Sequence, residues 1–204
     1  MSFSIQETRQ LISELGRMMF ERRLTDSAGG NISARLDDVI LITPRQAGSL
    51  YRWHLEPDQV LITDLQGNKI EGHGETSREG RVHFRLLNTF YPEGTAVVHG
   101  HAMNALVFCA FNQPLQSVLD DTEKFGNLIE VEYHPAHSPE LAEVILEAMR
   151  GEVEHLRNQA AAVLAPRHGV FVLGKDLNTA YDALERIDVN AYCVLMGHMM
   201  GWNA

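Results

Sequence analysis

The stretch Thr95-Ala-Val-Val-His-Gly-His101 decides the fold of this chain. Its small and β-branched residues predict a buried strand, and the strand ends in two histidines one residue apart. In a helix, side chains at positions i and i+2 point in different directions, but in an extended chain they project on the same side. His99 and His101 can therefore bind one metal ion only if they lie on a strand or at its end.

A second apolar stretch offers a third histidine. Residues 161–174 read Ala-Ala-Val-Leu-Ala-Pro-Arg-His-Gly-Val-Phe-Val-Leu-Gly, which predicts two short buried strands hinged at Pro166, with His168 at the hinge. Three neutral imidazoles with one open position are typical of a catalytic Zn²⁺ site, whereas a structural site has four protein ligands, usually including cysteine. The alternative is three core histidines bonded to the backbone. His-x-His at one strand end and His-Gly at another favour the metal site.

Length and composition limit the class of protein. A chain of 204 residues that is 45% hydrophobic can bury one substantial core, and without a linker or repeat we expect a single domain over residues 1–204. The net charge of −10 argues against a nucleic-acid or anionic-membrane partner. Cys109 and Cys193 are far apart in apolar segments, which favours a reduced intracellular protein. With no signal peptide or membrane-spanning run, we expect a cytoplasmic location.

A glycine-containing loop precedes the first predicted strand. Ser27-Ala-Gly-Gly-Asn-Ile-Ser33 could bring backbone N–H groups close to an oxyanion or phosphate. A plain turn before a strand is the simpler interpretation.

A helix start at residues 75–83 has two interpretations. In Glu75-Thr-Ser-Arg-Glu-Gly-Arg-Val-His83, a capping box between Thr76 or Ser77 and Glu79 would explain the acidic residue structurally. A helix N-terminus beside Arg78 also favours an anion. His83, one turn after Glu79, could lie near the site or hold Glu79 in place.

The remaining pattern predicts an α/β layered domain with a mixed, largely antiparallel sheet. Consecutive β stretches near residues 39 and 60, and again near 163 and 170, predict antiparallel pairs. Helices are expected at about 4–23, 76–91, 102–111, 138–157 and 177–200, and strands at 38–44, 59–64, 95–99, 128–133 and on either side of Pro166. In His134-Pro-Ala-His137, both histidines could be metal ligands by residue type, but the proline places them in a turn, and they are expected at the surface or behind the metal ligands.

Five motifs in order resemble the class II aldolase/adducin family over nearly the whole chain. They are Gly-Gly-Asn-Ile-Ser (29–33), Ile-Thr-Pro (42–44), Ser-x-Glu-x-x-x-His (77–83), Val-Val-His-x-His (97–101) and His-Gly (168–169). The resemblance implies a three-layer α/β/α sandwich and a homotetramer with sites at subunit interfaces. It also implies Zn²⁺, or another divalent ion such as Mn²⁺, Co²⁺ or Fe²⁺.

The resemblance also assigns roles to particular residues. Glu79 matches the acidic proton carrier, which in ligand-free states can also approach the metal, and Tyr133 matches a catalytic tyrosine contributed by a neighbouring subunit. The matched metal ligands are His99, His101 and His168, and the matched phosphate-binding residues are Asn31 and Ser77.

Departures from the family pattern concern the anion site. Arg45 replaces a small hydroxyl residue, Gln46 replaces a glycine, and Arg78 replaces the second of two serines. Two guanidinium groups can hold a phosphate or a carboxylate through paired hydrogen bonds. An anionic substrate is therefore still expected, with Arg45 and Arg78 among the residues that bind it.

The resemblance implies an aldehyde-lyase of the class II aldolase type, which is a metal-dependent carbon–carbon lyase. Its expected substrate is a small hydroxy-carbonyl compound with a phosphate or carboxylate end, such as a sugar phosphate, cleaved through a metal-stabilised enediolate. A dehydratase, epimerase or decarboxylase on the same scaffold is the alternative reaction. A non-catalytic adducin-like scaffold is a further alternative, which the presence of all three histidines and Glu79 disfavours.

Overall fold

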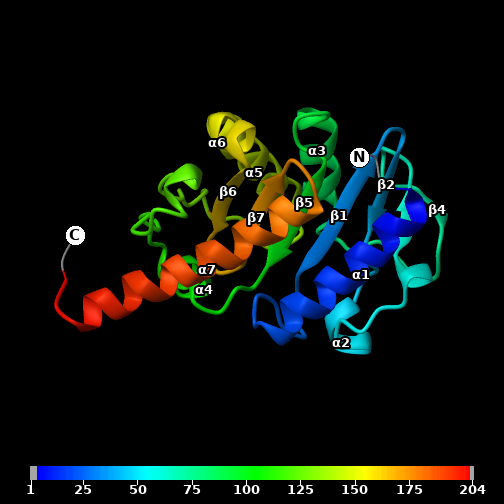
Figure 1. Cartoon of the computed structure of the whole chain (residues 1–204). Helices are drawn as coiled ribbons and strands as arrows, with labels where there is room; N and C mark the ends of the chain where they lie inside the picture. Colours follow the sequence, from blue (N-terminus) through cyan, green and yellow to red (C-terminus); the bar gives the residue numbers. More distant parts are fainter. Residues whose placement is uncertain (1–3, 203–204) are drawn as a thin grey trace.

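A seven-stranded sheet forms the centre of the molecule (Figure 1). The computed structural model describes residues 4–202. The strand order is β4-β3-β2-β1-β5-β7-β6, and every pair of neighbours is antiparallel. The strands are β1 (Asn31–Leu36), β2 (Val39–Ile42), β3 (Leu61–Thr63), β4 (Lys69–Glu71), β5 (Ala96–Gly100), β6 (Ala160–Ala165) and β7 (Gly169–Gly174). The predicted α/β class with a largely antiparallel sheet is confirmed.

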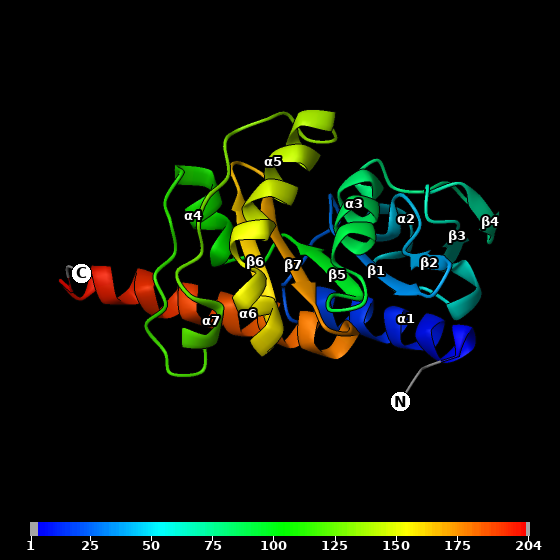
Figure 2. The same cartoon turned by 90° about the horizontal axis from the view of Figure 1, so that it is seen from above.

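Helices cover both faces of this sheet, as Figure 2 shows from above. They are α1 (Ile5–Glu21), α2 (Ala47–Tyr51), α3 (Gly80–Phe90), α4 (Ala105–Phe111), α5 (Pro139–Gly151), α6 (Val153–Asn158) and α7 (Leu177–Met199), with short 3₁₀ turns η1 (Pro57–Gln59) and η2 (Glu123–Phe125). One core lies under α1, α4 and α7, and a second lies under α3, α5 and α6. None of the helices within residues 4–202 is long and apolar enough to span a membrane.

Strand β5 is buried on both sides, which explains its uninterrupted apolar sequence. Ala96 and Val98 face the first core, and Val97 faces the second, because side chains alternate along a strand. In the register of the sheet, His99 lies opposite Asn31 of β1 and Phe171 of β7. The end of β5 and the starts of β1 and β7 therefore meet at one end of the central strands.

The prediction of a full strand over residues 128–133 was wrong. The segment makes only isolated bridges, Leu115 to Leu128 and, in parallel, Glu130 to Leu164. The Val131 N–H donates to Leu164, whose own N–H donates to Ile129, so the segment touches the outer strand β6 over one short stretch. Beyond Val131 the chain is exposed and turns toward the next helix, so no ladder can continue.

Three predicted helices begin or end differently in the structure. The helix predicted over 76–91 begins at Gly80. The helix predicted over 102–111 begins at Ala105, because the chain first completes a turn after the second histidine. The helix predicted over 138–157 is divided after Gly151 into α5 and α6, with Glu152 as the shared cap. The helix predicted over 177–200 matches α7 closely.

Candidate metal-binding active site

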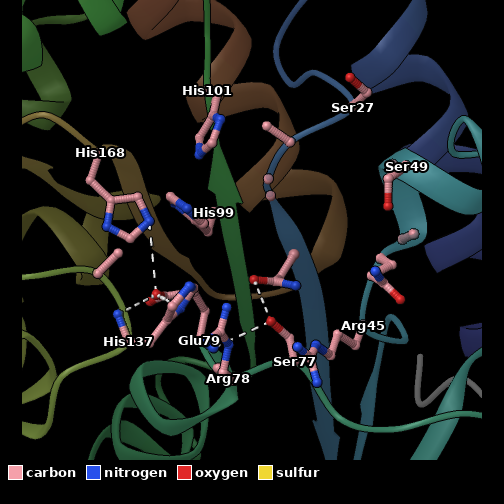
Figure 3. A pocket seen from close by; sticks show the side chains of 18 of the residues that line it. Ser27, Arg45, Ser49, Ser77, Arg78, Glu79, His99, His101, His137 and His168 are labelled. Atoms are coloured by element: carbon pink, nitrogen blue, oxygen red, sulfur yellow. Dashed lines mark hydrogen bonds and ion pairs between the residues drawn. The ribbon is translucent and has the colours of Figure 1, made fainter.

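Three imidazoles meet at the end of the central strands (Figure 3). His99 is on β5, His101 follows that strand directly, and His168 lies in the turn between β6 and β7. One nitrogen atom of each ring lies within 4.8 Å of the others. The ring centroids of His99 are 5.2 Å from His101 and 4.8 Å from His168. The structure thus brings together the three residues that the sequence pattern singled out.

Hydrogen bonds fix the orientation of two of these rings. Nδ1 of His99 lies 3.0 Å from the carbonyl oxygen of Val170, and Nδ1 of His101 lies 3.2 Å from Oδ2 of Asp26. Such contacts behind a metal ligand set its tautomer and aim the other ring nitrogen inward. Nε2 of both rings is buried and has no hydrogen-bond partner among the described residues. These free nitrogens fit a divalent cation.

Burial also keeps two of the imidazoles in the form that binds metal. It lowers the pKa of His99 well below the ordinary value, with the neighbouring His168 and His101 adding to the effect. Burial lowers the pKa of His168 to about 4, again helped by His101. Both rings are therefore neutral at neutral pH, as a metal ligand must be.

The glycine-containing loop makes room for His101. A Cβ atom on Gly29 would lie 2.2 Å from Cε1 of the His101 ring, so only glycine allows this approach. The N–H groups of Ala28 and Gly29 donate to Oδ1 of Asp26 at 2.7 and 3.0 Å. These two N–H groups are consequently engaged within the loop, and the simpler interpretation as a turn describes them best.

Glu79 is buried at the start of α3, with only 4% of its surface exposed. It does not form the predicted capping box, because the Glu79 N–H donates to Oγ of Ser77 while the carboxylate points into the site. Oε1 accepts the N–H of His137 at 2.8 Å and lies 3.9 Å from Nε2 of His168. Burial raises the pKa of Glu79, and the contact with His137 only partly opposes that effect. This carboxylate is placed to exchange protons.

His83 lies outside the site. It is fully buried, and its Nδ1 lies 2.7 Å from Oγ of Ser33. It is not among the residues that line the pocket, and its hydrogen bond to Ser33 on β1 secures α3 to the sheet. The hypothesis that His83 holds Glu79 is not supported.

The pocket beside the imidazoles has a volume of about 500 Å³ and is rich in cations. Three guanidinium groups line it, those of Arg45, Arg78 and Arg167. Arg45 binds Oε2 of Glu75 at 3.1 Å, whereas the guanidiniums of Arg78 and Arg167 have no ion-pair partner among residues 4–202. The predicted residues Asn31 and Ser77 also line the pocket, and Oγ of Ser77 donates to Oδ1 of Asn31 at 3.4 Å. Its lining suits an anionic ligand.

Tyr133 does not line this pocket. It is 50% exposed, and the Arg167 guanidinium lies 5.2 Å from the centroid of its ring. Its assignment to the site of a neighbouring subunit stays a prediction.

Sequence reasoning did not assign Arg167 to the site. Arg167 precedes a predicted ligand directly, and that adjacency was the available signal. His137 was expected at the surface or behind the metal ligands, and the structure places it in the lining of the pocket, where its N–H donates to Oε1 of Glu79.

Comparison with known proteins agrees with this geometry. Residues 10–195 match the family model Class II Aldolase and Adducin N-terminal domain. An L-fuculose phosphate aldolase of Methanococcus maripaludis is 30% identical over 173 residues, which cover 84% of this chain and 87% of the relative. A 3-oxo-tetronate 4-phosphate decarboxylase of Haemophilus influenzae is 30% identical over 190 residues, covering 90% and 84%.

A solved structure shares the fold. A solved L-fuculose 1-phosphate aldolase superposes with a TM-score of 0.83 at 23% identity, over 98% of this chain and 90% of that structure. The chain belongs to the class II aldolase/adducin family, as its motifs predicted. Its relatives named here are lyases, an aldolase and a decarboxylase.

Proposed function

We propose that this protein is a divalent-metal-dependent carbon–carbon lyase of the class II aldolase type, formed by a single domain over residues 1–204. Its substrate is a small hydroxy-carbonyl compound with a phosphate or carboxylate end. One observation carries the proposal: three imidazoles, one buried and two partly buried, have unpartnered nitrogens, and one nitrogen of each ring lies within 4.8 Å of the others, beside the buried carboxylate of Glu79. Named relatives that act on phosphorylated substrates support it.

The donor set indicates which ion the site would hold. His99, His101 and His168 would be the protein ligands, and three neutral imidazoles favour Zn²⁺, with Mn²⁺, Co²⁺ or Fe²⁺ as alternatives. When bound, such an ion supplies a Lewis acid that stabilises negative charge developing on a substrate oxygen. A ring nitrogen without a hydrogen-bond partner in each of the three histidines supports this fit better than a set of structural histidines, whose nitrogens would be bonded.

The remaining chemistry belongs to the side chains of the chain. Glu79 moves a proton to or from the carbon next to the carbonyl group, and its raised pKa favours that exchange near neutral pH. Arg45, Arg78, Ser77 and Asn31 hold the anionic end of the substrate and so orient its reacting carbons. In a homotetramer, Tyr133 of a neighbouring subunit handles the hydroxyl proton. We place the enzyme in the cytoplasm.

Two alternatives share this scaffold. A dehydratase, an epimerase or a decarboxylase would use the same imidazoles and carboxylate with a differently oriented substrate, and the decarboxylase relative favours the last of these. A non-catalytic adducin-like scaffold has no need for three clustered imidazoles with unpartnered nitrogens.

The test combines metal analysis with product analysis. We expect about one divalent ion per chain in freshly purified protein, and its loss together with activity in His99→Ala. Incubation with short hydroxy-carbonyl phosphates and carboxylates should give two carbonyl-derived fragments. A single dehydrated product would identify a dehydratase instead of an aldolase. Release of CO₂ would identify a decarboxylase, and an inverted stereocentre would identify an epimerase. A metal-free and inactive wild-type protein would refute the enzyme proposal.

A further inference from the structure

Arg167 lies in a fixed turn beside a histidine of the imidazole cluster. The turn joins β6 to β7 and also contains Pro166 and His168. The Arg167 N–H donates to the carbonyl oxygen of Cys109 at 2.8 Å. The His168 N–H donates to the carbonyl oxygen of Ala165 at 3.1 Å. Because both hydrogen bonds hold the backbone of the turn, Arg167 has a defined place next to the cluster.

The guanidinium of Arg167 is free to bind a ligand. It lines the pocket, and no carboxylate among residues 4–202 forms an ion pair with it. It lies over the ring of Tyr133, 5.2 Å from the ring centroid. A guanidinium held over an aromatic face keeps its N–H donors free for other partners. Glu79 is the one carboxylate among the described residues that line the pocket, and it accepts the N–H of His137 instead.

Arg167 and Arg45 stand on opposite sides of β5. The strand order β2-β1-β5-β7-β6 places Arg45, which follows β2, on one side of β5 and the turn before β7 on the other. Neighbouring strands are about 4.8 Å apart, so β2 and β7 are separated by roughly 14 Å. In Figure 3, Arg45 and Ser77 accordingly lie on one side of His99, and His168 lies on the other. A ligand that contacts Arg45 and Arg167 together therefore spans the imidazole cluster.

A substrate with a single anionic end would leave Arg167 without a partner. The chain has 27 acidic side chains against 17 lysines and arginines, so an unpaired guanidinium in this pocket does not reflect a generally basic protein. Its neighbour in the chain is the proposed metal ligand His168, and a divalent cation held there would repel the guanidinium. An anionic group between the two cations removes that repulsion. A carboxylate suits this place, because a planar guanidinium can donate two parallel N–H bonds to it.

We propose that Arg167 binds a carboxylate at the second end of the substrate, so that the substrate is anionic at both ends. The inference rests on the proposed function and narrows its substrate class to short hydroxy-carbonyl acids with a phosphate or a second carboxylate at the opposite end. The hydroxy-carbonyl part then lies over the imidazole cluster and beside Glu79. The opposite end is held by the residues already proposed for it, Arg45, Arg78, Ser77 and Asn31.

The test compares two probes that differ at one end only. The first is 4-phosphoerythronate, which has a phosphate at one end of a short carbon chain and a carboxylate at the other. In the second, erythritol 4-phosphate, a hydroxymethyl group replaces the carboxylate. Calorimetry with the wild-type protein should show that the carboxylate compound binds roughly tenfold to a hundredfold more tightly, the usual effect of a hydrogen bond to a charged group. Arg167→Gln should bind both probes equally, with its affinity for erythritol 4-phosphate unchanged.

Two further variants complete the experiment. Arg52→Gln is the matched control, because Arg52 is also an exposed arginine with a positive φ, 52° against 56° for Arg167, but does not line the pocket. It should keep the full preference for the carboxylate compound. Arg167→Lys keeps a positive charge at the site and should keep part of that preference.

The outcome separates this inference from the proposed function. Equal affinities of the wild type for the two probes, or a preference that survives in Arg167→Gln, would overturn the inference. Neither probe is a hydroxy-carbonyl compound that the enzyme could cleave, so the measurement does not depend on turnover. An inactive wild-type protein would refute the proposed function and leave the comparison of the two probes unaffected.

Discussion

Oδ2 of Asp26 lies 3.2 Å from Nδ1 of His101, so a carboxylate outside the imidazole cluster orients a ring inside it. Partial burial raises the pKa of Asp26, but the N–H of Ala28 and the imidazole of His101 outweigh burial and leave that pKa below its ordinary value. Asp26 is therefore ionised at neutral pH. It makes the imidazole a better donor toward a cation.

Loss of this carboxylate should weaken metal binding. We expect Asp26→Asn to raise the Zn²⁺ dissociation constant roughly 10–100-fold, the usual effect of removing a partner behind a metal ligand. The amide oxygen can still accept from the loop N–H groups, so circular dichroism should show a retained fold. Competition with a chelator measures the affinity, and Asp58→Asn on the exposed turn η1 is the control. Equal affinities in both variants would contradict the role of Asp26.

A methyl group at Gly29 should disturb the metal site more than the fold. Its Cβ would lie 2.2 Å from Cε1 of the His101 ring, so the ring must rotate away. We expect Gly29→Ala to lose most of its Zn²⁺ affinity at a modest cost in thermal stability. Gly151→Ala is the matched control, because a Cβ there meets nothing within 4 Å and should stabilise α5 by about 0.4–1 kcal/mol. Retention of metal binding in Gly29→Ala would contradict the close approach of the His101 ring to Gly29.

The guanidinium of Arg78 should determine affinity for the anionic end of a substrate. It lines the pocket and, unlike Arg45, is not paired with an acidic residue among residues 4–202. A hydrogen bond to a charged group contributes about 1.5–3 kcal/mol, so Arg78→Gln should weaken inhibition by inorganic phosphate roughly tenfold to a hundredfold. Arg81→Gln, one turn along α3 and outside the pocket, should leave inhibition unchanged. Equal inhibition constants for Arg78→Gln and Arg81→Gln would show that Arg78 does not bind the anion.

Acid should destabilise the metal-free protein partly through His83. Burial lowers the pKa of His83 to about 3, far below the ordinary value of 6.5, so between these values the unfolded chain binds the proton that the folded chain excludes. This contribution to the free energy of unfolding is complete above pH 6.5 and falls by up to about 1.4 kcal/mol per pH unit below it.

A double variant isolates that contribution. His83→Leu with Ser33→Ala removes both hydrogen-bond partners at once and leaves no unpaired polar group. Urea unfolding in the presence of chelator should show a shallower loss of stability between pH 6.5 and 4 than the wild type shows. Parallel pH profiles for the two proteins would assign acid sensitivity to other groups.

The local sequence pattern was sufficient to predict those elements whose conformation is determined by residues close together in the chain. The apolar run before His99 predicted β5, and the alternation of side chains placed His99 and His101 together. The apolar stretches on either side of Pro166 predicted β6 and β7 for the same reason. That His168 meets the other two depends on the pairing of β5 with β7, which the sequence suggested only through residue type.

Other features depend on contacts between distant segments, and these were not predictable. The Glu79 carboxylate makes no cap hydrogen bond at the start of α3 and instead accepts the N–H of His137, 58 positions later. Residues 128–133 have the composition of a strand, but only part of the segment reaches β6. Local propensity is overridden in both places by how the loop before α5 packs.

The three guanidiniums of this pocket differ in what lies next to them in the chain. Arg167 shares the turn between β6 and β7 with His168, and Arg78 directly precedes Glu79, whereas Arg45 lies on the connection between β2 and α2, which carries neither an imidazole of the cluster nor Glu79. Exchange of the connection that carries Arg45 would therefore change the ligand that the pocket accepts while the imidazole cluster and Glu79 stay in place. For protein engineering, the molecule offers a fixed reaction module with a replaceable recognition loop.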